Sequence, residues 1–111
     1  MQEDISRIIE KARELSDSIR SHAITRSYDE IREKMRSDRN AQELYAKLVM
    51  MGKEISMLLA REEKIEAKDS SEYELLREEL DHNPLVKEYI QTQREYLDLL
   101  KKVIERIENP L

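Results

Sequence analysis

The stretch that decides the fold runs from His82 to Ile107, HNPLVKEYIQTQREYLDLLKKVIERI. Asn83 is a residue type that caps helices, and Pro84 suits the first helical position, so this pair marks a helix start. Beyond it, one face is marked by residues spaced alternately three and four apart: Val86, Tyr89, Gln93, Tyr96, Leu100, Val103 and Ile107, widened by Ile90, Leu97 and Ile104. We therefore predict one long helix that packs against a partner along its whole length.

The composition favours an all-α fold. The 111 residues include one Gly, two Pro and no Cys, Trp or Phe, and 41% of them are charged. Such a chain lacks the residues that build tight turns and sheet cores, and its charge suits long exposed helices. We expect a single domain over residues 1–111, a bundle of about five helices with two of them long. Because a short chain buries a small fraction of its surface, association as a dimer or higher oligomer is expected.

Further helices are predicted before the long C-terminal one, each from a start signal followed by helical apolar spacing. Residues 68–71 are expected to form a connector. The expected helices are residues 4–21 with Asp4 as cap, 28–36 with Ser27 and Glu30 in capping-box spacing, 39–67 after a break at Ser37 and Asp38, and 71–81 with Ser71 and Glu74 in that spacing.

The helix expected over residues 39–67 would be about 40 Å long, more than a small monomer easily covers. Gly52 lies in its middle, where Gly costs about 1 kcal/mol relative to Ala. It therefore indicates either a close helix crossing or a slight bend. The expected buried side consists of Ala41, Leu44, Tyr45, Leu48, Met51, Ile55, Leu58, Leu59 and Ile65.

Charge is unevenly distributed along the chain. Residues 61–81 carry four basic and nine acidic side chains, so the whole net charge of −5 lies there. Without a strongly basic face, direct tight binding of nucleic acid is not expected. The acidic segment 62–81 would either steer a basic partner or simply keep the chain soluble. No apolar run is long enough to span a bilayer and no signal peptide is evident, so a cytoplasmic protein is expected.

Few residues suggest chemistry, and we assign no catalytic, cofactor-binding or metal-binding residue. The absence of Cys removes thiolate ligands and nucleophiles, and the single Gly excludes glycine-rich nucleotide loops. Glu79 and His82 have Glu-x-x-His spacing, which is half of a di-metal carboxylate motif, so a metal-binding bundle is the weaker alternative. The arginines at Arg32, Arg36 and Arg39 alternate with acidic residues and are interpreted as a solvated face.

Two motifs give the chain a resemblance to a known family. The first follows the pattern D-x-x-A-Q-x-L, and the second begins with the Asn-Pro pair described above. Their residues are Asp38, Ala41, Gln42 and Leu44, then Asn83, Pro84, Leu85, Val86, Tyr89 and Gln93. With the order of the predicted helices, they make nearly the whole chain similar to the bacterial YlbF/YmcA family. The resemblance implies a non-enzymatic helical bundle that associates as dimers or higher oligomers.

The resemblance also implies a regulatory function. Some family members work in a complex of YlbF, YmcA and YaaT with the endoribonuclease RNase Y, which affects competence, sporulation and biofilm formation. Certain members of that complex hold iron-sulfur clusters with cysteines, and this chain has none. A YheA-type paralogue, acting as a stand-alone structural homo-oligomer, is therefore the alternative.

The predicted interface uses the apolar sides of the two long helices. We expect a homo-oligomer, or a hetero-oligomer with YlbF-, YmcA- and YaaT-like proteins and RNase Y. The candidate interface residues are Leu48, Met51, Ile55, Leu58, Leu59, Tyr96, Leu100, Val103 and Ile107.

Overall fold

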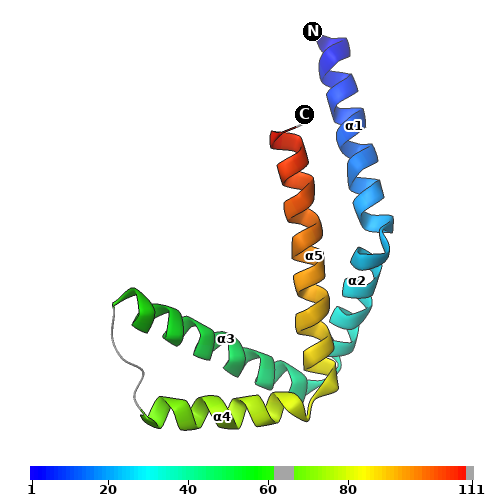
Figure 1. The fold of residues 1–111 in the computed structure, drawn as a ribbon. Coiled ribbons are helices and arrows are strands. Elements are labelled where there is room, and N and C mark those ends of the chain that lie inside the picture. The colour runs from blue at the N-terminus through cyan, green and yellow to red at the C-terminus, as the bar shows by residue number, and fades with distance from the viewer. Residues whose placement is uncertain (62–66, 110–111) are drawn as a thin grey trace. The chain divides into compact units, whose positions relative to one another are not determined.

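The structure is a computed structural model that describes residues 1–61 and 67–109, with side chains described outside residues 67–70. This part of the chain forms five helices (Figure 1) and contains no strand, which confirms the all-α prediction. The helices are α1 (Gln2–Ser21), α2 (Ala23–Arg36), α3 (Arg39–Ala60), α4 (Ala67–Asp81) and α5 (Pro84–Glu108). None of these helices is both long and apolar enough to cross a membrane.

The helices contribute to two compact units. Unit 1 comprises residues 1–30 and 92–111, and unit 2 comprises residues 31–91. Helices α2 and α5 supply residues to both units, whereas α1 belongs to unit 1 and the α3–α4 pair to unit 2.

The helix starts with strong local signals are confirmed. Asp38 has extended dihedrals and its Oδ1 accepts a hydrogen bond from the Ala41 N–H at 3.0 Å, so it caps α3. Asn83 caps α5 in the same way, with Oδ1 accepting from the Val86 N–H at 3.1 Å. Pro84 is the first residue of α5, where its missing N–H costs nothing.

The predicted starts of the first two helices are wrong. Helix α1 begins at Gln2 with Met1 as N-cap, so Asp4 lies in the first turn. Helix α2 begins at Ala23, and Ser27 is therefore inside the helix rather than at its cap. His22 separates the two helices: it is extended, its carbonyl accepts from Arg26 at 3.1 Å, and its Nδ1 accepts from Ile24 at 3.1 Å. An imidazole acceptor thus replaces the expected hydroxyl cap.

The boundary between α3 and α4 also differs from the prediction. Helix α3 ends at Ala60, with Arg61 as its C-cap, so it is about 33 Å long at 1.5 Å per residue instead of about 40 Å. Helix α4 begins at Ala67, so the expected connector over residues 68–71 is helical. Residues 62–66, which include Ile65 of the predicted buried side, lie outside the described part of the chain.

The hydrophobic core described in the structure lies in unit 2, where the C-terminal part of α2 meets α3 and the start of α5. Its buried members are Met35, Ala41, Leu44 and Val86, and the last of these is 0% exposed. Half-buried side chains from α3, α4 and α5 pack against them: Tyr45, Leu48, Leu76, Leu80, Leu85, Tyr89 and Ile90. Burial of this small set removes apolar surface from water and joins α2, α3, α4 and α5.

Unit 1 has fewer buried side chains. Helix α1 contributes none, although Ile19 is half-buried. The ring of Tyr28 on α2 stacks on Tyr96 of α5, with centroids 4.7 Å apart and an interplanar angle of 24°. Thr25 and Thr92 are buried polar residues of the same unit. This unit therefore leaves much of its apolar surface uncovered.

Gly52 does not mark a close helix crossing, which was one of its two sequence interpretations. A Cβ added to Gly52 would meet no atom within 4 Å in the part of the chain that the structure describes. We therefore expect Gly52→Ala to raise the free energy of unfolding by about 0.5–1 kcal/mol, because Ala loses less backbone freedom on forming a helix. Urea unfolding followed by circular dichroism measures this change, and a destabilised variant would contradict the expectation.

Candidate functional site

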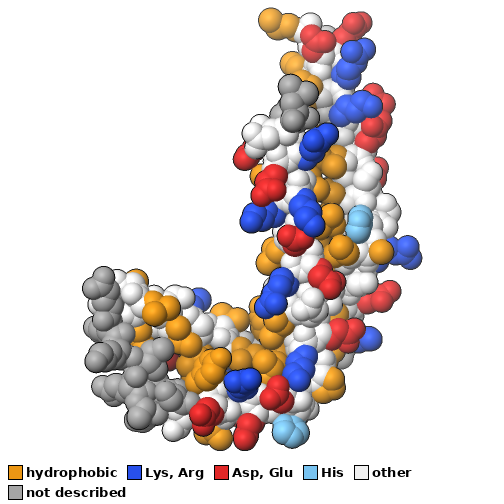
Figure 2. Space-filling view, viewed as in Figure 1, with side chains coloured by type: hydrophobic (Ala, Val, Ile, Leu, Met, Phe, Trp, Pro, Cys, Tyr) orange, Lys and Arg blue, Asp and Glu red, His pale blue; other side chains and the backbone are white. Residues whose placement is uncertain are grey.

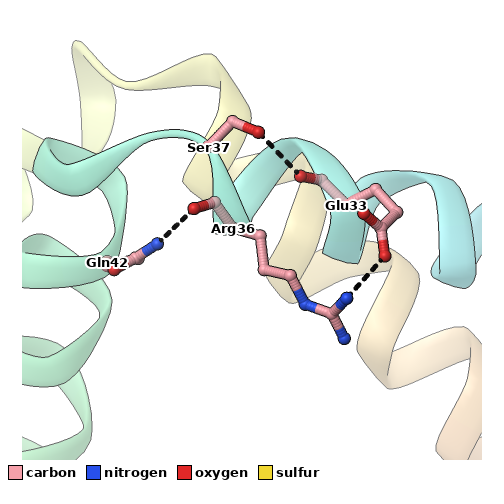
Figure 3. Close-up of polar contacts among 4 residues, drawn as sticks. All are labelled: Glu33, Arg36, Ser37 and Gln42. Carbon is pink, nitrogen blue, oxygen red and sulfur yellow. Dashed lines mark hydrogen bonds and ion pairs between the residues drawn. The ribbon is translucent and has the colours of Figure 1, made fainter.

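The first family motif builds the turn between α2 and α3. The carboxamide of Gln42 donates from Nε2 to the carbonyl oxygens of Met35 and Arg36, each at 2.9 Å. Both carbonyls lie in the last turn of α2, where the Met35 carbonyl also accepts from the Asp38 N–H at 3.2 Å. The contact of Gln42 with the Arg36 carbonyl is drawn in Figure 3. In the same turn, Ser37 Oγ donates to the Glu33 carbonyl at 3.4 Å. Gln42 is thus a side-chain cap that ties the end of α2 to the start of α3.

The second motif builds the start of α5 and its contact with α3. Val86 and Leu85 pack in the core, and the ring of Tyr89 meets Tyr45 edge-on, with centroids 4.9 Å apart and an interplanar angle of 84°. Within unit 1, Gln93 Nε2 donates to the hydroxyl of Tyr28 at 3.5 Å. The motif residues therefore hold helices together, and in this structure their contacts are those of caps and core.

The capping role of Gln42 leads to a stability prediction. We expect Gln42→Glu to lower the free energy of unfolding by about 1–2 kcal/mol, because a carboxylate has the same shape but no donor for the two carbonyls. Gln2→Glu, an equal charge change at an exposed position of α1, provides the control in the same urea titration. A Gln42→Glu effect no larger than the control would show that the two hydrogen bonds contribute nothing.

The structure divides the predicted interface residues between the two units. On α3, Leu48, Met51 and Ile55 are half-buried and line a groove of about 490 Å³ that also includes Gly52 and, from α4, Leu76. Leu58 is half-buried, whereas Leu59 is 67% exposed and so does not belong to the buried side where it was predicted. On α5, in unit 1, the half-buried candidates are Tyr96, Leu100 and Val103, and Ile107 is 63% exposed. Their role as an interface stays a prediction.

Ile107 is one of several exposed apolar side chains in unit 1, and sequence reasoning did not assign the others to the interface. We call this set the unit 1 apolar row; its members lie on α1 and on the part of α5 in unit 1. Large apolar side chains that remain exposed on two helices of one unit are candidates for a surface that binds another protein. Their helical spacing placed them on apolar helix faces. Spacing alone does not show which apolar side chains remain exposed after the helices pack. The row consists of Ile5, Ile8, Ile9, Leu15, Leu97, Ile104 and Ile107.

The two residues of the alternative metal-site hypothesis, Glu79 and His82, contact other groups of the chain. Nδ1–H of His82 donates to the Glu78 carbonyl at 2.8 Å, and Glu79 lies 3.9 Å from Lys47 Nζ. Over residues 1–61 and 67–109, no group of three or more His, Asp or Glu side chains is placed to hold a metal ion.

The arginines near the α2–α3 turn form surface ion pairs. Arg36 Nη1 lies 2.8 Å from Glu33, and Arg39 Nε lies 3.5 Å from Glu43, all with largely exposed side chains. Such pairs contribute little to stability, and they neutralise the positive charge of this surface. The structure therefore agrees with a solvated face at these positions.

The fold places this chain among all-α proteins that pack through long amphipathic helices. A family model described as "Control of competence regulator ComK, YlbF/YmcA" matches residues 8–111, so the chain belongs to the YlbF/YmcA family. This membership supports an adaptor role related to the regulation of competence, in a family of regulators rather than of known enzymes. A search of curated proteins gives no match.

Proposed function

We propose that this chain is a non-catalytic regulatory adaptor that acts with the RNA-processing machinery centred on RNase Y. Its partners are other copies of itself, YlbF-, YmcA- and YaaT-like proteins and RNase Y, and its place of action is the cytoplasm. The proposal treats residues 1–111 as one functional domain.

One observation carries this proposal. The unit 1 apolar row exposes seven large aliphatic side chains, among them Ile8 at 68% and Leu97 at 56%. Aliphatic side chains in such a row lose free energy when a partner removes them from water, by about 25 cal/mol for each Å² buried. A protein that works by association needs such a surface, and membership of a regulatory family supplies the biological setting.

The proposal is tested by mapping RNA 5′ ends across the transcriptome in cells with and without the gene for this chain. We expect processing at RNase Y cleavage sites to change without the protein and to return when it is restored. A restored copy carrying His82→Ala should act equally well, because an adaptor does not use this imidazole for chemistry. Unchanged RNA 5′ ends on deletion would contradict the RNase Y role.

The alternative is a stand-alone structural homo-oligomer of the YheA type. The same exposed row favours it, because a second copy also covers apolar surface. It predicts normal transcript processing in the deletion strain together with self-association of the purified protein.

A metal-binding bundle is distinguished by elemental analysis of protein purified without chelators, since such a site retains near-stoichiometric iron or manganese.

A further inference from the structure

A second apolar surface lies in unit 2, on the paired helices α3 and α4. Both helices line an open groove of about 340 Å³. Its apolar lining, which we call the floor, consists of Met50 and Met51 from α3 with Leu75 and Leu76 from α4, and we call its charged lining the border. Met50 is 65% exposed and Leu75 is 62% exposed, so the floor is open to solvent. Figure 2 shows hydrophobic side chains gathered over this helix pair. We call this surface the α3–α4 groove.

The border of the α3–α4 groove is acidic. Glu54 lies on the α3 side, and Glu72 and Glu79 lie on the α4 side. Lys47 is the basic residue that the groove includes, and its Nζ is 3.9 Å from Glu79. The border therefore has an excess of negative charge beside an apolar floor, and this charge is complementary to Lys and Arg.

A second copy of the chain is a poor occupant for this surface. A two-fold symmetric contact brings the same patch of both copies together, so two surfaces with the same excess of negative charge would meet. Like charges opposed across an interface cost affinity. The border thus favours a partner of opposite charge over self-association.

The shape and side chains of the floor favour a helix as occupant. A groove between two helices accepts the apolar face of a third, with anchors at helical spacing. Methionine side chains are unbranched and flexible, and they adapt to differently shaped anchors. An occupying helix with Leu or similar residues on one face and Lys or Arg beside them would satisfy both floor and border.

We infer that the α3–α4 groove is the docking site for a basic amphipathic helix of a partner protein. This inference rests on the proposed adaptor function and specifies the chemistry of one partner surface. It adds a heterologous contact in unit 2 to the apolar row of unit 1.

The probe is a fluorescent helical peptide of about 18 residues, or five turns, with Leu on one face and Lys on the other. Its affinity for the full chain is measured by fluorescence anisotropy at several salt concentrations. We expect Met50→Ala with Leu75→Ala to weaken binding roughly tenfold or more, since a few central anchors dominate most interfaces. Glu54→Gln with Glu72→Gln should weaken binding at low salt and flatten its salt dependence.

Matched controls separate the groove from the rest of the surface. Met57→Ala with Leu59→Ala removes one exposed Met and one exposed Leu of α3 outside the groove, and Glu88→Gln with Glu105→Gln removes two exposed carboxylates of α5. Both control pairs should leave the affinity within about twofold of the wild type. Circular dichroism of each variant establishes that it is folded, and a second peptide with Glu in place of Lys should not bind.

Three results would overturn the docking site. The first is failure of the Leu-Lys peptide to bind, and the second is equal weakening of binding by the groove and control variants. The third is a changed sedimentation coefficient of the Met50→Ala, Leu75→Ala variant, because that would make the groove a contact between copies of the chain. Failure of the proposed function is distinguishable from these. Peptide binding with normal RNA 5′ ends on deletion would reject only the RNase Y role. The opposite case is that deletion alters the RNA 5′ ends, the groove variants restore them fully, and these variants bind the peptide as tightly as the wild type. That result would reject only the groove as a docking site.

Discussion

Leu44→Ala is expected to lower the free energy of unfolding by about 3 kcal/mol, a large part of the 5–15 kcal/mol typical of a whole domain. Leu44 is 5% exposed and belongs to the buried cluster with Met35, Ala41 and Val86. Its truncation leaves a cavity that stiff neighbouring helices fill only in part, so the lost contacts add to the lost transfer free energy. Urea unfolding at constant protein concentration measures the change.

Leu75→Ala is the matched control, because it removes the same atoms from a side chain that is 62% exposed. We expect its effect to stay within about 0.5 kcal/mol. Equal losses from the two variants would show that the cluster around Leu44 is not the core that holds α2, α3 and α5 together.

Glu substitutions in the unit 1 apolar row are expected to produce the second large effect. We predict that the wild-type chain sediments as a dimer or higher oligomer at micromolar concentration. Ile8→Glu with Ile104→Glu should convert it to the 13.3 kDa monomer, because a buried carboxylate without a partner opposes association. Both side chains are more than half exposed in the single chain, so the helices themselves should tolerate the changes.

The control for this experiment is Ser6→Glu with Gln2→Glu, which adds the same charge to exposed positions of α1 outside the row. It should leave the oligomer intact. A wild-type chain that sediments as a monomer would reject the self-association proposal, and dissociation of the control would attribute the effect to net charge instead.

The sequence predicted the all-α fold and the helix starts at Asp38 and Asn83, since those signals are local. A carboxylate or carboxamide directly before a helical stretch has few roles other than capping. The cap at His22 was missed because imidazole is not among the usual capping groups. The Ser27–Glu30 spacing was misleading because a capping box requires a free helix end, and the helix already extends from Ala23.

The candidate site was harder to predict, because exposure is a property of the packed chain. Helical spacing placed Leu59 with the buried residues of α3, yet it is 67% exposed. Apolar residues such as Ile8 and Leu97 have the same pattern as core residues until the packing shows which of them remain uncovered. Gly52 likewise suggested a crossing that depends on neighbours far away in the sequence, and the structure has none there.

The role of Gln42 lay between these cases. The motif containing Gln42 was evident from the sequence, and its contact across the turn to Met35 and Arg36 required the structure. A glutamine four residues after a helix cap has many possible partners, and the direction of the preceding helix decides which carbonyls it reaches.

Affinity capture of the full chain, tagged and made at its native level, tests the adaptor role most directly. The measurement is the identity and amount of the proteins recovered at low salt, compared with the Ile8→Glu, Ile104→Glu variant and its Ser6→Glu, Gln2→Glu control. We predict that RNase Y and YlbF-, YmcA- or YaaT-like proteins are recovered with the wild type and the control and are lost with the row variant. Recovery of the wild-type chain without these proteins would contradict the account.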